Sequence, residues 1–501
     1  MVAEAGVYKI WSRKNYKSTL MIQKRKNIYY LTLAWLLIIL SSTTNYAAYI
    51  DTSKADYNVS VFAKQEQGMV SPFLMGFNIV YAYEKDAPWK AHVPELIKKL
   101  STKPLRWPGG TVTTFYHWNN LTGQGWADSW SPTFDASKNA PPSMYMDVDE
   151  YLALTKKINS EPLVGINMGS GQKYNRVKDG IEDAKKLMKY CISKGVKVKY
   201  YYLDNEPYQP DANYTFTAEE YADNVNNYVA EMKKIDPNIK IIVNTHPNKD
   251  LYTKTLITRA GKNIDYVDVH FYWRFQNATF NNWKAEPKMT HRRERPYNEQ
   301  RDIFRKIFAD GGYPNIELMV LEWNIGPNGA GNLPPTEAEA SLMVAEEFTQ
   351  FIQSGLFMSC FWPISTPAKV DWANRALMNS QNNHDPNKMY DMFGLYTDVL
   401  GEQQVKASVS AVRLITIAVK SKAGNEMWVY MINKNLEKPA VNVNVALNDF
   451  KASGYSAVGF EAADSTEGPL KMKKVDIVKK DASHFTLMVP QFSFVKVTLK
   501  K

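Results

Sequence analysis

The 501-residue sequence has little cysteine and lacks the motifs of several common enzyme classes. Its two cysteines, Cys191 and Cys360, fall in a predicted amphipathic helix and a predicted buried strand, which favours two buried thiols over a disulfide. No Gly-x-Ser-x-Gly motif supplies a serine nucleophile, and no glycine-rich turn follows an early strand to hold a phosphate. The histidines show no metal-ligand spacing. We therefore expect neither a catalytic metal nor a cofactor.

The chain also lacks a basic tract of the kind that binds nucleic acid. Its formal charge is +10, but residues 1–48 contribute +6 of this, which leaves +4 for the remaining residues. Because nucleic-acid binding depends on clustered Lys and Arg, we expect no nucleic-acid partner. Aromatic residues, in contrast, make up 13% of the sequence, which is compatible with a surface that stacks on sugar rings.

Residues 1–48 have the layout of a secretory leader. Leu31–Leu40 is an unbroken apolar run, preceded by Lys24-Arg25-Lys26 and followed by small and polar residues. Ten apolar residues are too few to span a bilayer as a helix, so the pattern predicts a signal peptide, with translation starting at Met1 or Met21. An uncleaved membrane anchor is the alternative. We expect a secreted, periplasmic or cell-surface protein without stable membrane insertion after removal of the leader.

Residues 71–400 alternate between short apolar segments and helical patterns. Eight strands alternating with helices predict an α/β fold, a (β/α)₈ TIM barrel; a doubly wound sheet is the alternative, but the glycine-rich turn is missing. The predicted strands cover residues 74–80, 105–108, 162–168, 196–205, 239–244, 266–272, 317–322 and 358–363. The predicted helices include residues 93–100, 148–158, 182–194, 217–235, 297–309 and 337–354.

Residues 401–501 have a different pattern, with short alternating segments separated by turn residues. This pattern predicts a C-terminal all-β sandwich, and the alternating segment 59–62, within residues 49–70, is expected to join it. The predicted sandwich strands are residues 409–419, 427–433, 440–447, 456–460 and 485–499.

Two glutamates stand where apolar strands end. Glu206 follows residues 196–205 and precedes a proline, and Glu322 follows residues 316–321. In a parallel barrel the active site lies at the C-terminal strand ends, so these side chains are expected to meet there. Glycoside hydrolases use a pair of carboxylates, and we expect Glu206 to be the general acid/base and Glu322 the nucleophile. The alternatives are an exposed helix N-cap at Glu206 and a buried ion pair at Glu322.

Other polar and aromatic residues end neighbouring strands. Asn205 is expected to hydrogen-bond the sugar 2-hydroxyl, and Arg106 to contact Glu322 or the substrate. His270 and Tyr272 share one strand face and are expected to hydrogen-bond Glu322 or a sugar hydroxyl, although a structural histidine is the alternative. Trp118, in an aromatic loop, and Trp362, on the eighth strand, are expected to contact the sugar; their alternatives are a cap on the barrel and core packing.

At these residues the chain resembles the clan A glycoside hydrolases, retaining (β/α)₈ enzymes whose acid/base follows an asparagine on strand four and whose nucleophile ends strand seven. Residues 105–110, 116–119, 161–171 and Glu322-Trp323-Asn324 resemble the family 51 α-L-arabinofuranosidases. The chain departs from family 51 at Asp204-Asn205-Glu206-Pro207, where family 51 usually carries Gly-Asn-Glu. This motif is more similar to that of the family 44 endoglucanases and xyloglucanases. Families 39 and 86, which include xylosidases and agarases, are also similar.

The resemblance implies a secreted retaining glycoside hydrolase that acts on a plant or algal polysaccharide, in the manner of an α-L-arabinofuranosidase. An endo-acting β-glycanase of endoglucanase, xyloglucanase or agarase type is the alternative enzyme. A catalytically silent carbohydrate-binding protein on the same fold is the alternative of another class. Retention of both glutamates argues against it, because a binding protein has no need of the pair.

Overall fold

The computed structural model describes most of the chain beyond its first 53 residues. The predicted leader lies outside this part, so its role stays a prediction. The described residues are 54–81, 83–84, 86–119, 127–138, 146–210, 212–290, 295–329, 331–365, 374–379 and 383–501.

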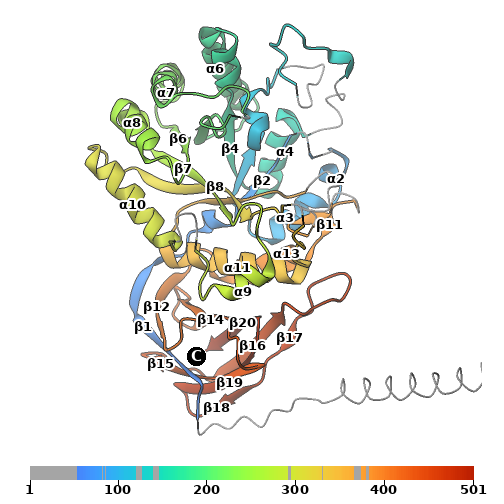
Figure 1. Cartoon of the computed structure of the whole chain (residues 1–501), viewed down its shortest axis with the longest axis vertical. Coiled ribbons are helices and arrows are strands. Elements are labelled where there is room, and N and C mark those ends of the chain that lie inside the picture. Colours follow the sequence, from blue (N-terminus) through green and yellow to red (C-terminus); the bar gives the residue numbers. More distant parts are fainter. Residues whose placement is uncertain are drawn as a thin grey trace, which may run out of the picture. The chain divides into compact units, whose positions relative to one another are not determined.

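Eight parallel strands form a closed barrel in chain order, and the pairing of Phe77 with Phe361 closes it. Helices follow the strands, as Figure 1 shows, and all eight predicted strands are confirmed, with shifted ends. The strands are β2 (Phe77–Asn78), β3 (Pro104–Trp107), β4 (Glu161–Ile166), β5 (Tyr200–Leu203), β6 (Lys240–Thr245), β7 (Tyr266–Trp273), β8 (Glu317–Ile325) and β9 (Ser359–Phe361).

The helices begin where local sequence favours them. Thr217 caps α7 by accepting from the Glu220 N–H, and the Glu220 side chain accepts in turn from the Thr217 N–H, which makes a capping box. The helices are α2 (Asp86–Lys90), α3 (Val93–Lys99), α4 (Val148–Ile158), α5 (Gly169–Lys173), α6 (Val177–Ser193), α7 (Ala218–Met232), α8 (Asp250–Ala260), α9 (Phe280–Ala285), α10 (Tyr297–Asp310), α11 (Glu337–Ser354) and α13 (Lys388–Gly394). None of the helices in the described part of the chain is long and apolar enough to cross a membrane.

Side chains fill the barrel interior by alternation along the strands. Tyr200 and Tyr202 of β5 and Met319 and Leu321 of β8 belong to one buried interior cluster, whereas Tyr201 faces the helices. This alternation would turn Glu322 outward, but the pairing of β8 with β7 shifts register between Asp268 and His270. The resulting bulge turns Glu322 into the mouth of the barrel, because an extra residue reverses the facing of those after it.

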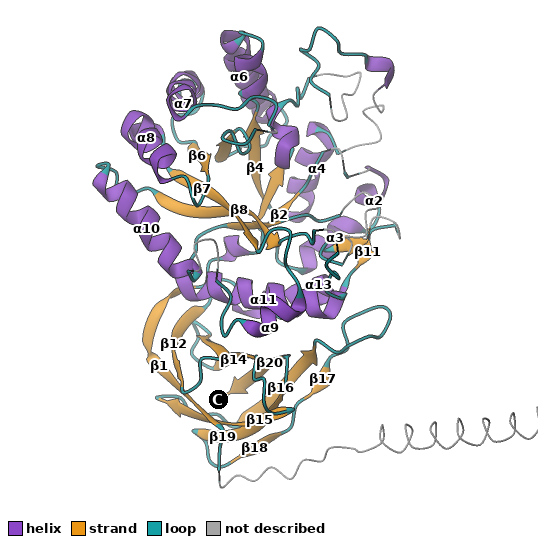
Figure 2. Ribbon diagram, in the orientation of Figure 1, coloured by secondary structure: helices purple, strands orange, loops and turns teal. Residues whose placement is uncertain are grey.

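The C-terminal region is all-β, as predicted, and its strands appear in orange in Figure 2. Ten strands form one curled sheet around a second core, and β1 (Tyr57–Met69) joins it between β12 and β15 as expected. Two predicted strands are wrong, because each contains a turn: residues 410–413 separate β12 from β13, and residues 491–492 separate β19 from β20. The other strands are β12 (Gln403–Val409), β13 (Leu414–Lys420), β14 (Glu426–Asn433), β15 (Ala440–Asn448), β16 (Gly454–Glu461), β17 (Lys473–Lys474), β18 (Ile477–Lys479), β19 (His484–Pro490) and β20 (Ser493–Lys500).

Both cysteines are buried free thiols, in agreement with the expectation from their positions. A separate two-stranded ribbon, β10 (Met378–Asn379) with β11 (Asp385–Pro386), completes the described strands. Short 3₁₀ turns are described over Pro72–Leu74, Gly110–Thr114, Ala136–Lys138, Gly261–Asn263 and Thr397–Val399.

Candidate active site

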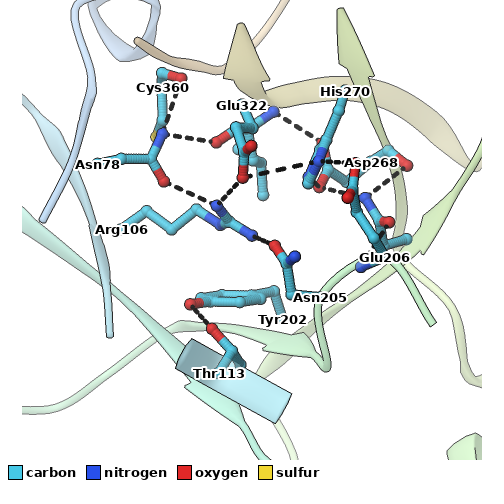
Figure 3. Close-up of polar contacts among 12 residues, drawn as sticks. Asn78, Arg106, Thr113, Tyr202, Asn205, Glu206, Asp268, His270, Glu322 and Cys360 are labelled. Atoms are coloured by element: carbon cyan, nitrogen blue, oxygen red, sulfur yellow. Dashed lines mark hydrogen bonds and ion pairs between the residues drawn. The ribbon is translucent and has the colours of Figure 1, made fainter. Parts of the chain in front are cut away.

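Arg106, at the end of β3, lies at the centre of the site and is fully buried. Its Nη1 donates to Asn78 Oδ1 at 2.7 Å and to Glu322 Oε2 at 3.0 Å, and its Nη2 donates to Asn205 Oδ1 at 2.5 Å (Figure 3). The guanidinium lies 4.4 Å from the ring centroid of Tyr202. A buried cation needs this many partners, because an unpaired one would be strongly destabilising. Arg106 therefore fixes the ends of β2, β5 and β8 relative to one another.

The Glu322 carboxylate is held from both oxygens. Arg106 binds Oε2, and the Tyr272 hydroxyl donates to Oε1 at 2.8 Å. Tyr272 comes from β7, the strand next to β8, where it pairs with Asn324. These contacts confirm the expected partnership of Arg106 with Glu322 and the expected hydrogen bond from the 270–272 strand face. The carboxylate is thereby oriented, since neither oxygen can rotate without losing a bond.

Glu206 meets His270 at the mouth of the barrel. The Glu206 Oε1 atom lies 2.9 Å from His270 Nδ1, and the same nitrogen lies 3.6 Å from Glu322 Oε2. On the other side of the ring, His270 Nε2 contacts Asp268 Oδ2 at 3.1 Å. The two predicted glutamates thus converge on one imidazole, and Asp268 holds that imidazole in place.

Glu206 is the more accessible of the two carboxylates. A quarter of its side chain is exposed (25%), against a tenth of the Glu322 side chain (10%). Its backbone N–H donates to Asn244 Oδ1 at 3.1 Å, which ties the turn after β5 to the end of β6. Glu206 can therefore exchange protons with an incoming group, whereas Glu322 is set deeper beside Arg106.

Trp362 lies beside the glycine pair that follows β3. Gly110 has a φ of +55°, and a Cβ at this position would lie 2.5 Å from the Trp362 ring. Tyr83 packs edge-on against the same ring, with 6.1 Å between the ring centroids. Burial, and to a smaller extent the Glu322 charge, raises the pKa of the Tyr83 hydroxyl. The glycines thus permit this close approach, and Trp362 stands near the carboxylates, where sugar contact stays a prediction.

Trp118 takes a different position. Its ring packs against Tyr190 of α6 at 4.9 Å between centroids, and its Nε1 donates to the Asp183 carbonyl at 3.3 Å. These contacts resemble the capping role that the sequence left open for the aromatic loop. Its predicted role in substrate binding therefore has no support from the contacts described.

Three residues of the site escaped the sequence analysis. Asn78 donates from Nδ2 to the carbonyls of Leu321 and Cys360, at 2.9 and 3.0 Å, and so links β2 to β8 and β9. Asp268 accepts from the Leu321 N–H at 2.7 Å, and Asn244 donates to Asp268 Oδ2 at 2.8 Å. Asp268 was detectable, because it stands two residues before His270 on the same strand face. Nothing local marked Asn78 or Asn244.

Burial and neighbouring charges set the protonation states of His270, Glu206 and Tyr272. Burial opposes the charge of His270, but Glu322, Asp268 and Glu206 outweigh it and raise the pKa of the imidazole to about 10. Burial alone would raise the pKa of Glu206, but the hydrogen bond and charge of His270 lower it. Tyr272 stays protonated, because burial and the Glu322 charge raise its pKa well above 10. In the resting site the proton between Glu206 and His270 therefore lies on the histidine.

The raised pKa of His270 predicts a loss of stability in alkali. The folded state holds this proton more tightly than the unfolded chain, whose histidines titrate near 6.5, so the contribution is complete below that pH and disappears as the pH rises towards 10. We expect the free energy of unfolding to fall by a few kcal/mol over this range. Urea unfolding at several pH values measures it, and a His270→Asn variant with the same slope as the wild type would contradict it.

Loss of the Tyr272 hydroxyl should impair activity without loss of the fold. A hydrogen bond to a charged group contributes about 1.5–3 kcal/mol, so Tyr272→Phe should lower kcat/KM by about 10- to 100-fold. The side chain otherwise keeps its shape, and the melting temperature should change little. Equal kcat/KM values for the variant and the wild type would show that this bond does not orient Glu322 during turnover.

The site places two carboxylates, those of Glu206 and Glu322, beside two cations, Arg106 and the protonated His270. The described residues contain no group of three or more His, Cys, Asp or Glu side chains placed to hold a metal ion. The arrangement can hold an anionic nucleophile at Glu322, move a proton at Glu206 and stabilise negative charge with Arg106.

Comparison with known proteins agrees with the sequence resemblance. A family model described as "Alpha-L-arabinofuranosidase 1 domain" matches residues 96–288, a stretch that includes Glu206 and ends before Glu322. The intracellular exo-α-(1→5)-L-arabinofuranosidase of Acetivibrio thermocellus is 27% identical over 266 residues, which is 47% of this chain and 49% of that protein. The α-L-arabinofuranosidase C of Emericella nidulans is 26% identical over 37% of this chain and 40% of its own length. The chain thus spans half or less of these relatives.

Solved structures extend the likeness to both regions of the fold. The α-L-arabinofuranosidase of Thermotoga maritima aligns with a TM-score of 0.68 at 19% identity, over 89% of this chain and 100% of that chain. CelM2, a bifunctional glucanase-xylanase from a metagenome library, aligns with a TM-score of 0.62 at 15% identity, over 89% of this chain and 99% of that chain. The chain therefore has the fold of these glycoside hydrolases and is similar in sequence to α-L-arabinofuranosidases.

Proposed function

We propose that this protein is a retaining glycoside hydrolase of α-L-arabinofuranosidase type, with Glu322 as nucleophile and Glu206 as general acid/base. The observation that carries the proposal is the convergence of the two carboxylates on His270 Nδ1, at the C-terminal end of the barrel strands. The sequence likeness to arabinofuranosidases supports the choice of sugar. The carboxylate pair supports the reaction.

The spacing of the carboxylates favours retention of configuration. Glu206 Oε1 lies 2.9 Å and Glu322 Oε2 lies 3.6 Å from one nitrogen, so the two oxygens are no farther apart than the sum of these distances. Inverting enzymes need roughly 6.5–9.5 Å between the carboxyl groups to admit a water, whereas retaining enzymes keep them about 5–5.5 Å apart. The space here suits direct attack by Glu322 better than attack by a water between the two.

In the first step Glu322 attacks the anomeric carbon while the bond to the leaving oxygen breaks. Arg106 and Tyr272 hold the Glu322 carboxylate with one oxygen directed at the sugar. This fixed orientation lowers the entropic cost of bringing the carboxylate to the anomeric carbon. Glu206 gives its proton to the leaving oxygen. That proton comes from the Glu206–His270 pair, and Asp268 keeps the imidazole in place as the proton moves.

In the second step a water attacks the glycosyl–Glu322 ester, and Glu206 accepts its proton. Esterification removes the negative charge of Glu322, which is the largest influence that raises the pKa of His270. With that charge neutralised, His270 holds its proton less tightly, which favours transfer of the proton through Glu206 to the leaving oxygen. The pair is then one proton short and accepts one from the attacking water. Cleavage of the ester restores the Glu322 carboxylate and its bonds to Arg106 and Tyr272.

A second enzyme function, endo-acting glycanase, has its own support. Asp204-Asn205-Glu206-Pro207 departs from the family 51 pattern in the direction of family 44, and the fold also aligns with a glucanase-xylanase. The chemistry at Glu206 and Glu322 is the same in both functions. They differ in the substrate, which is a terminal arabinofuranose for one and the interior of a β-glycan for the other.

The leader supports a location outside the cytoplasm, in the periplasm, at the cell surface or in the medium. The leader alone supports this location, since four of the similar arabinofuranosidases are named intracellular. Cell fractionation with N-terminal sequencing of the mature protein tests it. A product that begins after residue 40 in the medium or periplasm is expected, and an uncut cytoplasmic chain would contradict the proposal.

Chromatography of the products tests the substrate proposal. The protein is incubated with arabinan, arabinoxylan, xyloglucan, β-glucan and agar, with a Glu322→Ala variant as blank. Release of arabinose alone is expected. A ladder of oligosaccharides would favour the glycanase, and binding without any product would favour the silent carbohydrate-binding protein.

A further inference from the structure

The residue before the Asn205–Glu206 pair has a backbone conformation that favours glycine. Asp204 has a φ of +65°, in the left-handed region, and Glu206 follows with a φ of +43°. A side chain at such a position is strained unless its surroundings hold it there. The family 51 pattern places glycine at this position, and this chain places an aspartate. The Asp204 side chain must therefore compensate for the conformation that a glycine would adopt freely.

The Asp204 carboxylate is buried against the backbone that it shapes. Its residue is 1% exposed, and Oδ1 accepts from the Asn205 N–H at 2.8 Å. Its Oδ2 lies over the first turn of α5, where a Cβ on Gly169 would be 3.4 Å away. The backbone N–H groups of Gly169 and Met168 favour the ionised carboxylate. The side chain thus hydrogen-bonds its own turn through Oδ1, while Oδ2 is buried beside the loop after β4.

The turn at Asp204 carries the side chains of both Asn205 and Glu206. Asn205 Oδ1 accepts from Arg106, and the Glu206 N–H donates to Asn244 Oδ1. Asp204 fixes the first peptide of the turn and Asn244 fixes the second. If the Asp204 contact is lost, the peptide that carries Asn205 can rotate, and the direction of the Glu206 side chain changes with it.

We propose that Asp204 is a positioning residue whose ionised carboxylate holds the left-handed turn and thereby aims Glu206 at the leaving oxygen. The proposal rests on the acid/base role of Glu206 proposed above. Asp204 does not touch the substrate. It acts through the peptide of Asn205, and its loss should impair protonation of the leaving group more than attack by Glu322.

The protonation of Asp204 gives the proposal a pH signature. Burial raises the pKa of this carboxyl to about 7. The titratable groups that face it are Tyr221 and Tyr228 of α7 and Tyr252 of α8, whose pKa values burial raises, so they stay neutral in this range. Below about pH 7 the carboxylate gains a proton and accepts less strongly from the Asn205 N–H. Activity should therefore fall on the acid side of pH 7.

The test compares two aryl α-L-arabinofuranosides, one with a good and one with a poor leaving group. Asp204→Ala should lower kcat/KM by about 100-fold or more on the poor leaving group, and by less than about tenfold on the good one, because only the former needs the general acid. Asp204→Asn keeps an acceptor oxygen but cannot ionise. It should retain activity to within about tenfold and shift the acid limb of the pH profile to lower pH.

A matched control separates positioning from backbone strain. Asp449 also has a left-handed φ, +63°, and lies in the β-sheet region, where its exposed carboxylate pairs with Lys64. Asp449→Ala carries the same backbone cost and should leave both substrates unaffected. If Asp204→Ala does not fold, the acid limb of the pH profile of Asp204→Asn carries the test, because the amide keeps the shape of the side chain.

Three outcomes overturn the proposal. These are equal losses on both substrates in the Asp204 variants, no loss on either, and an unshifted acid limb in Asp204→Asn. Glu206→Ala, measured beside them, shows whether the proposed function itself holds. If that variant discriminates between the leaving groups and the Asp204 variants do not, only the positioning role is wrong. If Glu206→Ala does not discriminate, the acid/base assignment fails first.

Discussion

Glu322→Ala is expected to lower turnover by at least about 10⁴-fold on every substrate that the protein hydrolyses. No other carboxylate described at the barrel mouth can take its place, because Asp268 is bound to His270 and Leu321 N–H, and Glu206 is bound to His270. Initial-rate measurements with an activated aryl glycoside, whose good leaving group needs no acid assistance, isolate this step. The loss should be equally large on good and poor leaving groups.

The fold of this variant should persist with a modest loss of stability. Removal of Glu322 takes one of three acceptors from the buried Arg106, which keeps Asn78 and Asn205. Glu322→Gln keeps an acceptor and should be closer to the wild type in melting temperature while equally inactive. Glu317→Ala is the matched control, since Glu317 is an exposed glutamate at the other end of the same strand. Turnover near the wild-type rate in Glu322→Ala would rule out the nucleophile.

Glu206→Ala is expected to lose about 10²- to 10⁴-fold in kcat/KM on substrates with poor leaving groups, and much less on activated ones. On activated substrates the glycosyl–enzyme forms but hydrolyses slowly, because no base accepts the proton of the water. Azide needs no such base and fits the space that the carboxylate leaves. It should therefore restore turnover and yield a glycosyl azide with the configuration of the substrate.

The same variant separates the two carboxylates by role. Azide should have no effect on Glu322→Ala, in which the first step is blocked, and none on Glu317→Ala, which keeps both glutamates. A Glu206→Ala enzyme that is insensitive to azide and hydrolyses poor leaving groups normally would contradict the acid/base role. An azide product of inverted configuration would contradict the double displacement.

Much of the site follows from the strand pattern alone. Glu206 and Glu322 end apolar strands, and in a parallel barrel those ends meet, so their proximity needed only the correct fold. Arg106, His270 and Tyr272 were recognisable for the same reason, as polar residues where apolar strands stop. The structure places all three on the two carboxylates.

The parts that sequence could not supply depend on register and on loop paths. The β8 bulge that turns Glu322 inward appears only as a shift in pairing, and no residue type marks it. Asn78 bonds to β8 and β9, which lie beside β2 where the barrel closes but are more than 240 residues away in the chain, and such pairings leave no local signal. Trp118 was assigned to the substrate by its residue type, but the path of its loop brings it against α6.

The left-handed turn at Asp204 lies between these two cases. The sequence showed that an aspartate occupies a position where family 51 has glycine, but only the φ of +65° explains what the difference means. An aspartate that bonds to its own turn can adopt this conformation, which few other side chains can do. The departure from the family pattern is therefore a change in how the acid/base turn is held.

The central claim, a covalent glycosyl intermediate on Glu322, is tested most directly by mass spectrometry. Glu206→Ala is mixed with an activated aryl α-L-arabinofuranoside, quenched in acid, and mapped by proteolysis. The account predicts one anhydropentose per chain, on the peptide that contains Glu322, which disappears when azide is added. Release of the aryl alcohol with no adduct, or with the sugar on another residue, would contradict it.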